Sequence, residues 1–134
     1  MTNHEHALVD RMETAADRLN TFFQEIAAEV PKYSGVTAEV KILEEDGFVW
    51  HLALERTTHG WVFLLNKSSL GGTEYEQSPL LNASRRMLVL GAKNISRLLD
   101  ALRREADEET CKLEDAGRDL EKILMNLRRL KVST

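Results

Sequence analysis

The sequence has a single cysteine, Cys111, in a chain of 134 residues. One cysteine cannot form an internal disulfide, so no disulfide framework holds this fold together. Cys111 stands in the charged stretch Glu108 to Lys112, where no neighbouring residues form a recognisable activating site. We therefore expect an ordinary surface thiol and not a nucleophile.

Long apolar runs are also missing. No stretch approaches the roughly 18 consecutive apolar residues of a membrane-spanning helix. The first residues, Met1 to His6, are polar and lead into a charged segment, which is unlike a secretory signal peptide. We therefore expect a protein without a membrane span, located in the cytoplasm.

The chain lacks an excess of positive charge. Its formal net charge is -4, whereas a dedicated nucleic-acid binder usually carries a basic excess that neutralises phosphates. This acidity disfavours a nucleic-acid-binding function, although it leaves room for a local basic patch.

No recognisable catalytic or metal-binding pattern is present. The four histidines, His4, His6, His51 and His59, show neither metal-ligand spacing nor a Ser-His-Asp or Cys-His arrangement. The adjacent glycines Gly71 and Gly72 lack the lysine of a phosphate-binding loop. We expect no catalytic, cofactor-binding or metal-ligating residues, no cofactor, and a protein that is not an enzyme.

Hydrophobic residues make up 43% of the chain, and their periodicity predicts the secondary structure. A stripe spaced by three and four residues predicts a helix from about His4 to Val30, ended by Pro31. Its members are Leu8, Met12, Ala15, Leu19, Phe22, Ile26 and Val30.

Strict alternation then predicts three strands, 36–42, 48–55 and 61–66, joined by tight turns into an antiparallel meander. We expect a three-residue turn at Glu45-Asp46-Gly47, since a two-residue turn would place the apolar residues on opposite faces. The expected pairs are Glu44 with Phe48, Ile42 with Trp50, and Val40 with Leu52.

The second turn is expected at His59-Gly60, which pairs Arg56 with Phe63 and Leu54 with Leu65. The third strand is apolar on both faces, and we expect the protein's own last helix to cover Val62 and Leu64. A second subunit is the alternative cover.

A polar connector follows from Lys67 to Gln77, and Ser78-Pro79 predicts the start of the last helix. From there a heptad pattern runs without a slip to Leu130. It favours one continuous helix, but its seam is weak from Glu105 to Thr110. A helical hairpin of 79–106 and 107–130 is the alternative.

The sequence therefore predicts a single α+β domain over residues 1–134, in the order αβββα. Residues 107–134 form a helical extension that the rest of a small domain cannot cover, and such an exposed stripe normally binds another chain. The candidate self-association residues are Leu113, Leu120, Ile123, Leu127 and Leu130.

Arginines along the last helix give a second candidate surface. Arg85, Arg86, Arg128 and Arg129 are the candidate contacts for a partner or for phosphate. Basic residues near a helix C-terminus also stabilise the helix dipole, which explains the last of them without a ligand.

The order of helix, three-stranded meander and long helix resembles that of dimeric nucleoid-associated proteins that bind DNA, and that of small acidic secretion chaperones. The resemblance concerns element order, no motif carries it, and the heptad tail departs from both groups.

The function that the sequence favours is a non-enzymatic protein-interaction module, such as an adaptor, chaperone or regulatory subunit, that acts as a homodimer with a further protein partner. The alternatives are a dimeric nucleic-acid-binding protein that uses the arginines of the last helix, and a small ligand-binding domain or enzyme. The pocket of the latter would lie between sheet and helix, near Trp50 and Trp61.

Overall fold

The computed structural model describes residues 2–33 and 35–133 and confirms the α+β class. Helix α1 (Asn3–Glu29) precedes the strands β1 (Glu39–Glu45), β2 (Phe48–Thr57), β3 (Gly60–Ser69) and β4 (Tyr75–Pro79). A 3-10 turn, η1 (Leu80–Asn82), leads into helix α2 (Arg85–Ser133). The strands form one antiparallel sheet in the order β1-β2-β3-β4. The expected meander is present, with one strand more than the sequence indicated.

Helix α1 begins and ends where its sequence requires. Thr2 and Glu5 form a capping box, in which each side chain accepts a hydrogen bond from the other residue's backbone N–H. Val30, the residue before Pro31, has extended backbone angles of φ -59° and ψ 132°. Lys32 donates a hydrogen bond to the carbonyl oxygen of Ala27 and so satisfies a group in the last helical turn.

The expected start of the last helix at Ser78-Pro79 is wrong. These residues belong to β4, where Ser78 pairs with Leu65 and Pro79 with Leu64. Proline is tolerated there because β4 is an edge strand. The cap is supplied by Ser84 instead, whose Oγ accepts a hydrogen bond from the backbone N–H of Met87 at 3.3 Å.

Helix α2 is continuous over 49 residues, so the continuous alternative is confirmed and the helical hairpin is wrong. The weak seam from Glu105 to Thr110 contains no glycine or proline, and nothing there interrupts the backbone hydrogen bonds.

In the first hairpin the turn and the strand pairing differ from those expected, although Val40 and Leu52 still pair. Its turn has two residues, Asp46 and Gly47, with φ of 55° and 80°, as expected for an Asp-Gly hairpin. The expected three-residue turn is therefore wrong. Val40 nevertheless pairs with Leu52, because Ile42 forms a β-bulge that corrects the register.

The second hairpin turns at Thr58-His59, one residue before the expected turn. Each residue of β2 therefore pairs with a residue of β3 two positions earlier than expected. Leu54 therefore pairs with Phe63, and Leu52 with Leu65. The shift is an even number of residues, so the apolar residues still share one face of the sheet.

Both helices pack on that face. Phe23 of α1 meets Phe63 of β3 edge to face, with ring centroids 6.0 Å apart. The rest of the buried cluster comes from the two helices, β2, β3 and η1, and consists of Ala27, Leu52, Leu54, Leu65, Leu80, Leu88, Ile95, Leu98 and Leu102. We call the sheet, η1 and the helix segments packed against them the head.

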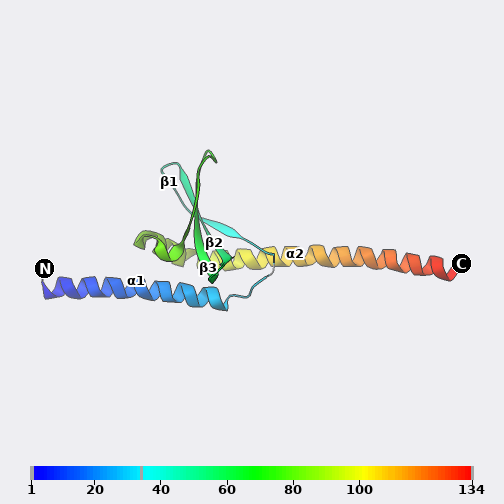
Figure 1. Ribbon diagram of the computed structural model, residues 1–134, viewed down its shortest axis with the longest axis horizontal. Coiled ribbons are helices and arrows are strands. Elements are labelled where there is room, and N and C mark those ends of the chain that lie inside the picture. Colours follow the sequence, from blue (N-terminus) through cyan, green and yellow to red (C-terminus); the bar gives the residue numbers. More distant parts are fainter. Residues whose placement is uncertain (1, 34, 134) are drawn as a thin grey trace.

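The helices run in the same direction but are displaced along their axes (Figure 1). The C-terminal part of α1 lies beside the first part of α2, and Val30 lines a groove together with Leu99 and Leu102. Two helical segments consequently project from opposite ends of the head. We call α1 residues 3–15 the N-terminal arm and α2 residues 107–133 the distal segment.

The head predicts a clear stability contrast between two leucines. Leu98 is completely buried, so Leu98→Ala should lower the free energy of unfolding by about 3 kcal/mol through lost burial and a residual cavity. Leu70→Ala, at an exposed loop position, should change it by less than about 0.5 kcal/mol. Chemical denaturation measures both, and equal losses would contradict the packing described here.

Candidate functional site

The distal segment carries an apolar stripe that the rest of the chain does not cover. The five candidate self-association residues are between 54% and 65% exposed. Earlier members of the same heptad series, Leu88, Ile95 and Leu102, are 8% exposed or less because they pack in the head. The stripe is therefore continuous with the core, and it loses its cover where α2 leaves the head.

The stripe is wider than the five candidates. Leu124, 45% exposed, lies next to it on the helix surface. Ala116 lies within the stripe and Gly117 beside it, and the space where a Cβ of Gly117 would lie is open. Small residues let a second helix approach closely, so the surface combines large apolar side chains with room for a partner.

Charge is unevenly distributed along the distal part of α2. Residues 105–115 contain six acidic residues and one lysine, whereas residues 123–133 contain three basic residues and no acidic one. The acidic part lies next to the head, and the basic part lies at the far end of the helix.

The structure does not bring the four candidate arginines together. Arg85 and Arg86 lie at the start of α2, and Arg128 and Arg129 lie more than ten helical turns away. Arg86 binds the carboxylate of Glu45 on β1 through both terminal nitrogens, at 3.2 and 2.5 Å. These arginines therefore cannot form one phosphate-binding strip on a single chain.

The pair formed by Glu45 and Arg86 shifts both pKa values. The hydrogen bonds and charge of Arg86 hold the pKa of Glu45 below its ordinary value, and Glu45 raises the pKa of Arg86. Since the pair joins β1 to the first turn of α2 at the surface, we assign it a structural role.

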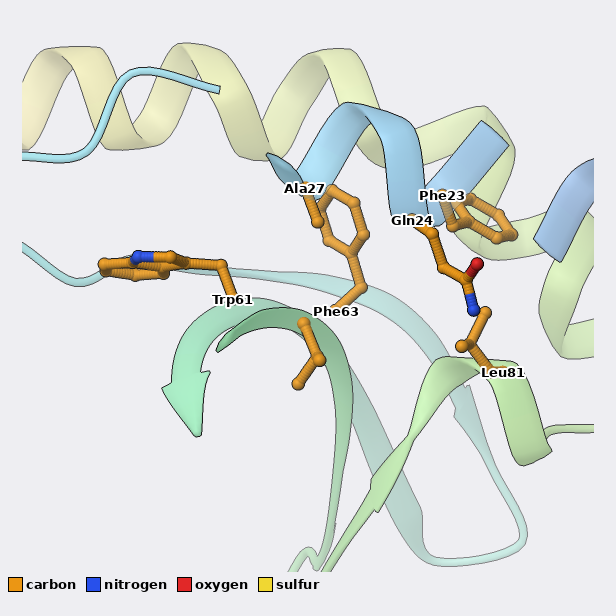
Figure 2. A pocket seen from close by; sticks show the side chains of 7 residues that line it. Phe23, Gln24, Ala27, Trp61, Phe63 and Leu81 are labelled. Carbon is orange, nitrogen blue, oxygen red and sulfur yellow. The ribbon is translucent and has the colours of Figure 1, made fainter. Parts of the chain in front are cut away.

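The proposed pocket between sheet and helix is small. Residues from α1, β3 and η1 enclose a cavity of about 30 Å³, as Figure 2 shows. Its lining consists of Phe23, Gln24, Ala27, Trp61, Val62, Phe63 and Leu81. Pockets for small-molecule ligands measure about 300–1,000 Å³, so this cavity holds water at most.

Trp50 does not line this cavity. It lies toward the other end of the hairpin, where the ammonium group of Lys67 is 5.2 Å from its ring centroid and 4.3 Å from that of Phe48. At the cavity, the ammonium group of Lys32 is 5.2 Å from the ring centroid of Trp61, and burial lowers the pKa of Lys32. The two tryptophans thus serve separate contacts.

The other face of the sheet carries a polar network centred on Asn66, which is 7% exposed. Its Oδ1 accepts hydrogen bonds from Tyr75 Oη at 3.1 Å and Gln77 Nε2 at 2.9 Å, and its Nδ2 donates to Glu39 at 3.0 Å. Gln77 Nε2 also donates to Glu55 at 3.0 Å. The network ties all four strands together, which favours a structural role.

Leu64 lies on this second face, outside the core cluster that the helices share, so the expected cover of this residue by the protein's own last helix is wrong. Val62 lines the small cavity together with Phe23 and Ala27, so its neighbouring helix is α1 and not α2. Leu64 pairs with Ala53 and Pro79 and is 5% exposed.

Metal-binding clusters of three or more histidine, cysteine or acidic residues are absent from residues 2–33 and 35–133. Within those same ranges, no helix is long and apolar enough to cross a membrane. Cys111 is exposed on α2.

The sequence reasoning missed the N-terminal arm as a surface. Leu8, Val9 and Met12 are 38% to 52% exposed, because they lie on a segment of α1 that projects away from α2 (Figure 1). The apolar pattern was visible, whereas the displacement between the helices was not.

Comparison with known proteins yields no family, no curated protein and no solved structure that matches this chain. The candidate site is therefore defined by its own geometry alone.

The Glu45–Arg86 pair leads to a pH-dependent prediction. Because the pKa of Glu45 is lowered on folding, the pair should stabilise the fold above the ordinary glutamate pKa and lose this effect as pH falls through the folded value. Arg86→Gln should therefore raise the pKa of Glu45, and it should lower the unfolding midpoint at pH 7 but not near pH 2.

Carboxyl resonances followed by NMR during a pH titration measure the first effect, and thermal unfolding measures the second. Arg85→Gln removes the same charge one position earlier and serves as the control. An equal effect of both variants on Glu45 would show that general charge, and not the contact, lowers its pKa.

Proposed function

We propose that this protein is a non-enzymatic interaction module that acts as a homodimer through the distal segment of α2. A single observation carries the proposal: the heptad stripe that is buried in the head continues from Leu113 to Leu130, over almost five helical turns, where its five large members are more than half exposed. Contiguous apolar surface of this kind marks an association site.

The energy available in the stripe is sufficient for association. Each copy contributes six large aliphatic side chains, the five candidates and Leu124. Complete burial of one such side chain yields about 1.5–3 kcal/mol, and roughly half of that area is still free in the single chain. Two copies would gain about 10–20 kcal/mol, against an association cost of roughly 4–15 kcal/mol.

A second copy of the same chain is the natural occupant. The stripe follows the alternating three- and four-residue spacing that lets two helices interlock their side chains. An adaptor or regulatory role fits a module whose association surface is helical and whose heads remain available to another protein.

The double variant Leu120→Asp/Leu127→Asp tests this proposal. It places charge at the centre of the stripe in both copies and should weaken self-association at least about a thousandfold. Light scattering coupled to size-exclusion chromatography measures the mass, which should fall from two chains to one.

A matched control is available on the opposite side of the same helix. Met125→Asp/Val132→Asp introduces the same two charges with the same seven-residue spacing, and both residues are exposed. This variant should retain the mass of two chains. The homodimer proposal fails if the wild-type chain has the mass of one chain, or if the Leu120/Leu127 variant keeps the wild-type mass with an intact helical spectrum.

Nucleic-acid binding is the second candidate, favoured by one observation. The end of α2 carries Arg128, Arg129 and Lys131 without a single acidic residue from 123 to 133.

If this end binds phosphates, DNA should be retained at low salt and released as salt rises. Arg128→Gln/Arg129→Gln should reduce the salt slope by about two, and Arg85→Gln/Arg86→Gln should not. Absence of retention at low salt would exclude this function.

A further inference from the structure

The charge distribution of the distal part of α2 distinguishes between two ways of pairing it. In a parallel pair, the acidic residues 105–115 of both copies lie side by side, as do the basic residues 123–133. In an antiparallel pair, each acidic part meets the basic part of the other copy. Like charges in close contact are unfavourable and opposite charges are favourable, so the charges favour the antiparallel pair.

The apolar positions define a register for that pair. The seam consists of two series, Leu113, Leu120 and Leu127, and Ala116, Ile123 and Leu130. When two copies run in opposite directions, one register places every member of the first series against a member of the second. Leu113 then faces Leu130 of the second copy, Leu120 faces Ile123, and Leu127 faces Ala116.

The same register brings charges of opposite sign together. Glu114 of one copy lies beside Arg128 of the other, at positions that flank the seam, whereas Glu121 and Lys122 each lie beside their own counterpart at the centre. Ser133 lies opposite Thr110 of the other copy, beyond the last groove of the head at Leu102 and Arg103. The two helices can therefore pair from residue 110 to residue 133 without meeting the heads.

Resting on the proposed function, we propose that the distal segments of two copies pair antiparallel in this register, giving a rod with one head at each end. At 1.5 Å per residue, the two Ile95 residues would lie about 80 Å apart. The N-terminal arms, which project from the heads away from the distal segments, occupy the two outer ends of the rod (Figure 1).

This geometry makes the dimer a bivalent spacer. Each end presents the same arm, with Leu8, Val9 and Met12 exposed. Two identical sites held at a fixed separation bind a partner with paired sites more tightly than either site alone, provided that the partner spans the same distance.

Other arrangements of two copies have different lengths. A single chain, with its helix of 49 residues and an arm of 13 residues, measures roughly 95 Å. The antiparallel rod measures roughly 150 Å, because the starts of the two α2 helices are about 110 Å apart and an arm extends beyond each. A parallel pair, or a pair in which each distal segment covers the arm of the other copy, stays close to the length of one chain.

Small-angle X-ray scattering of the unmodified protein, with mass and longest dimension measured on the same sample, tests the proposal. Two chains with a longest dimension near 150 Å support the antiparallel rod. Two chains with a dimension near 100 Å overturn the rod and leave the homodimer intact. The mass of one chain overturns both the rod and the proposed homodimer.

Disulfide exchange tests the register itself in a Cys111→Ser background. Leu113→Cys and Leu130→Cys are exposed positions, so each variant should fold, and a linked dimer should form only when the two variants are mixed. Linkage within either variant alone would indicate a parallel pair. Linkage of Met12→Cys with Ile123→Cys in place of the first pair would indicate that the distal segment covers the arm.

Discussion

The mismatch in length between α2 and the sheet on which it packs underlies the rest of the structure. The strands run steeply across α2, so the sheet packs only against the first part of a helix that extends about 74 Å (Figure 1). The sheet can therefore cover only about half of the helix. Leu88, Ile95, Leu98 and Leu102 use that cover, and the continuation of the same stripe is left in water. Because the helix is unbroken, the packing of its first half also fixes the direction in which its second half projects.

The position of α1 determines that this exposed stripe is not covered within the chain. Phe23 and Ala27 anchor the C-terminal part of α1 beside the first part of α2, through contacts with Phe63 and the helix core. With α1 running in the same direction as α2, its remaining turns extend past the start of α2 and away from the distal segment. A helix running in the opposite direction could have covered part of the distal stripe. The molecule is thus elongated, with a compact centre and two amphipathic projections.

The distribution of polar contacts agrees with this division of roles. In the head, polar side chains bind one another: Asn66 joins the strands, Arg86 binds Glu45, and Lys32 binds the end of α1. In the distal segment the charged residues surround an apolar stripe and change sign along the helix. Self-association in an antiparallel rod would use both the stripe and the charge gradient, and it would leave the network on the open sheet face undisturbed.

The sequence by itself determined those features that depend on local periodicity. The alternation of apolar residues specified β1 to β3, the three- and four-residue spacing specified both helices, and the absence of glycine and proline near residues 105–110 kept α2 continuous. The exposed candidates from Leu113 to Leu130 followed from the same pattern, because a stripe that outruns its domain must be exposed. The register of β1 against β2 did not follow from periodicity alone. Asp46-Gly47 forms a two-residue turn, and the bulge at Ile42 places the apolar residues of β1 back on the core face of the sheet.

Only the tertiary structure decided the features that depend on distant neighbours. Ser78-Pro79 has the local preference of a helix start, yet it forms β4 because the backbone of β3 offers hydrogen bonds to its edge. The exposure of Leu8 and Met12 depends on the displacement of α1 along α2, which is fixed by the contact of Phe23 with Phe63 and not by any spacing within α1. A local preference depends only on the residues of one segment, whereas the burial of a side chain depends on which segments pack against each other. Only the packed core determines which segments do so.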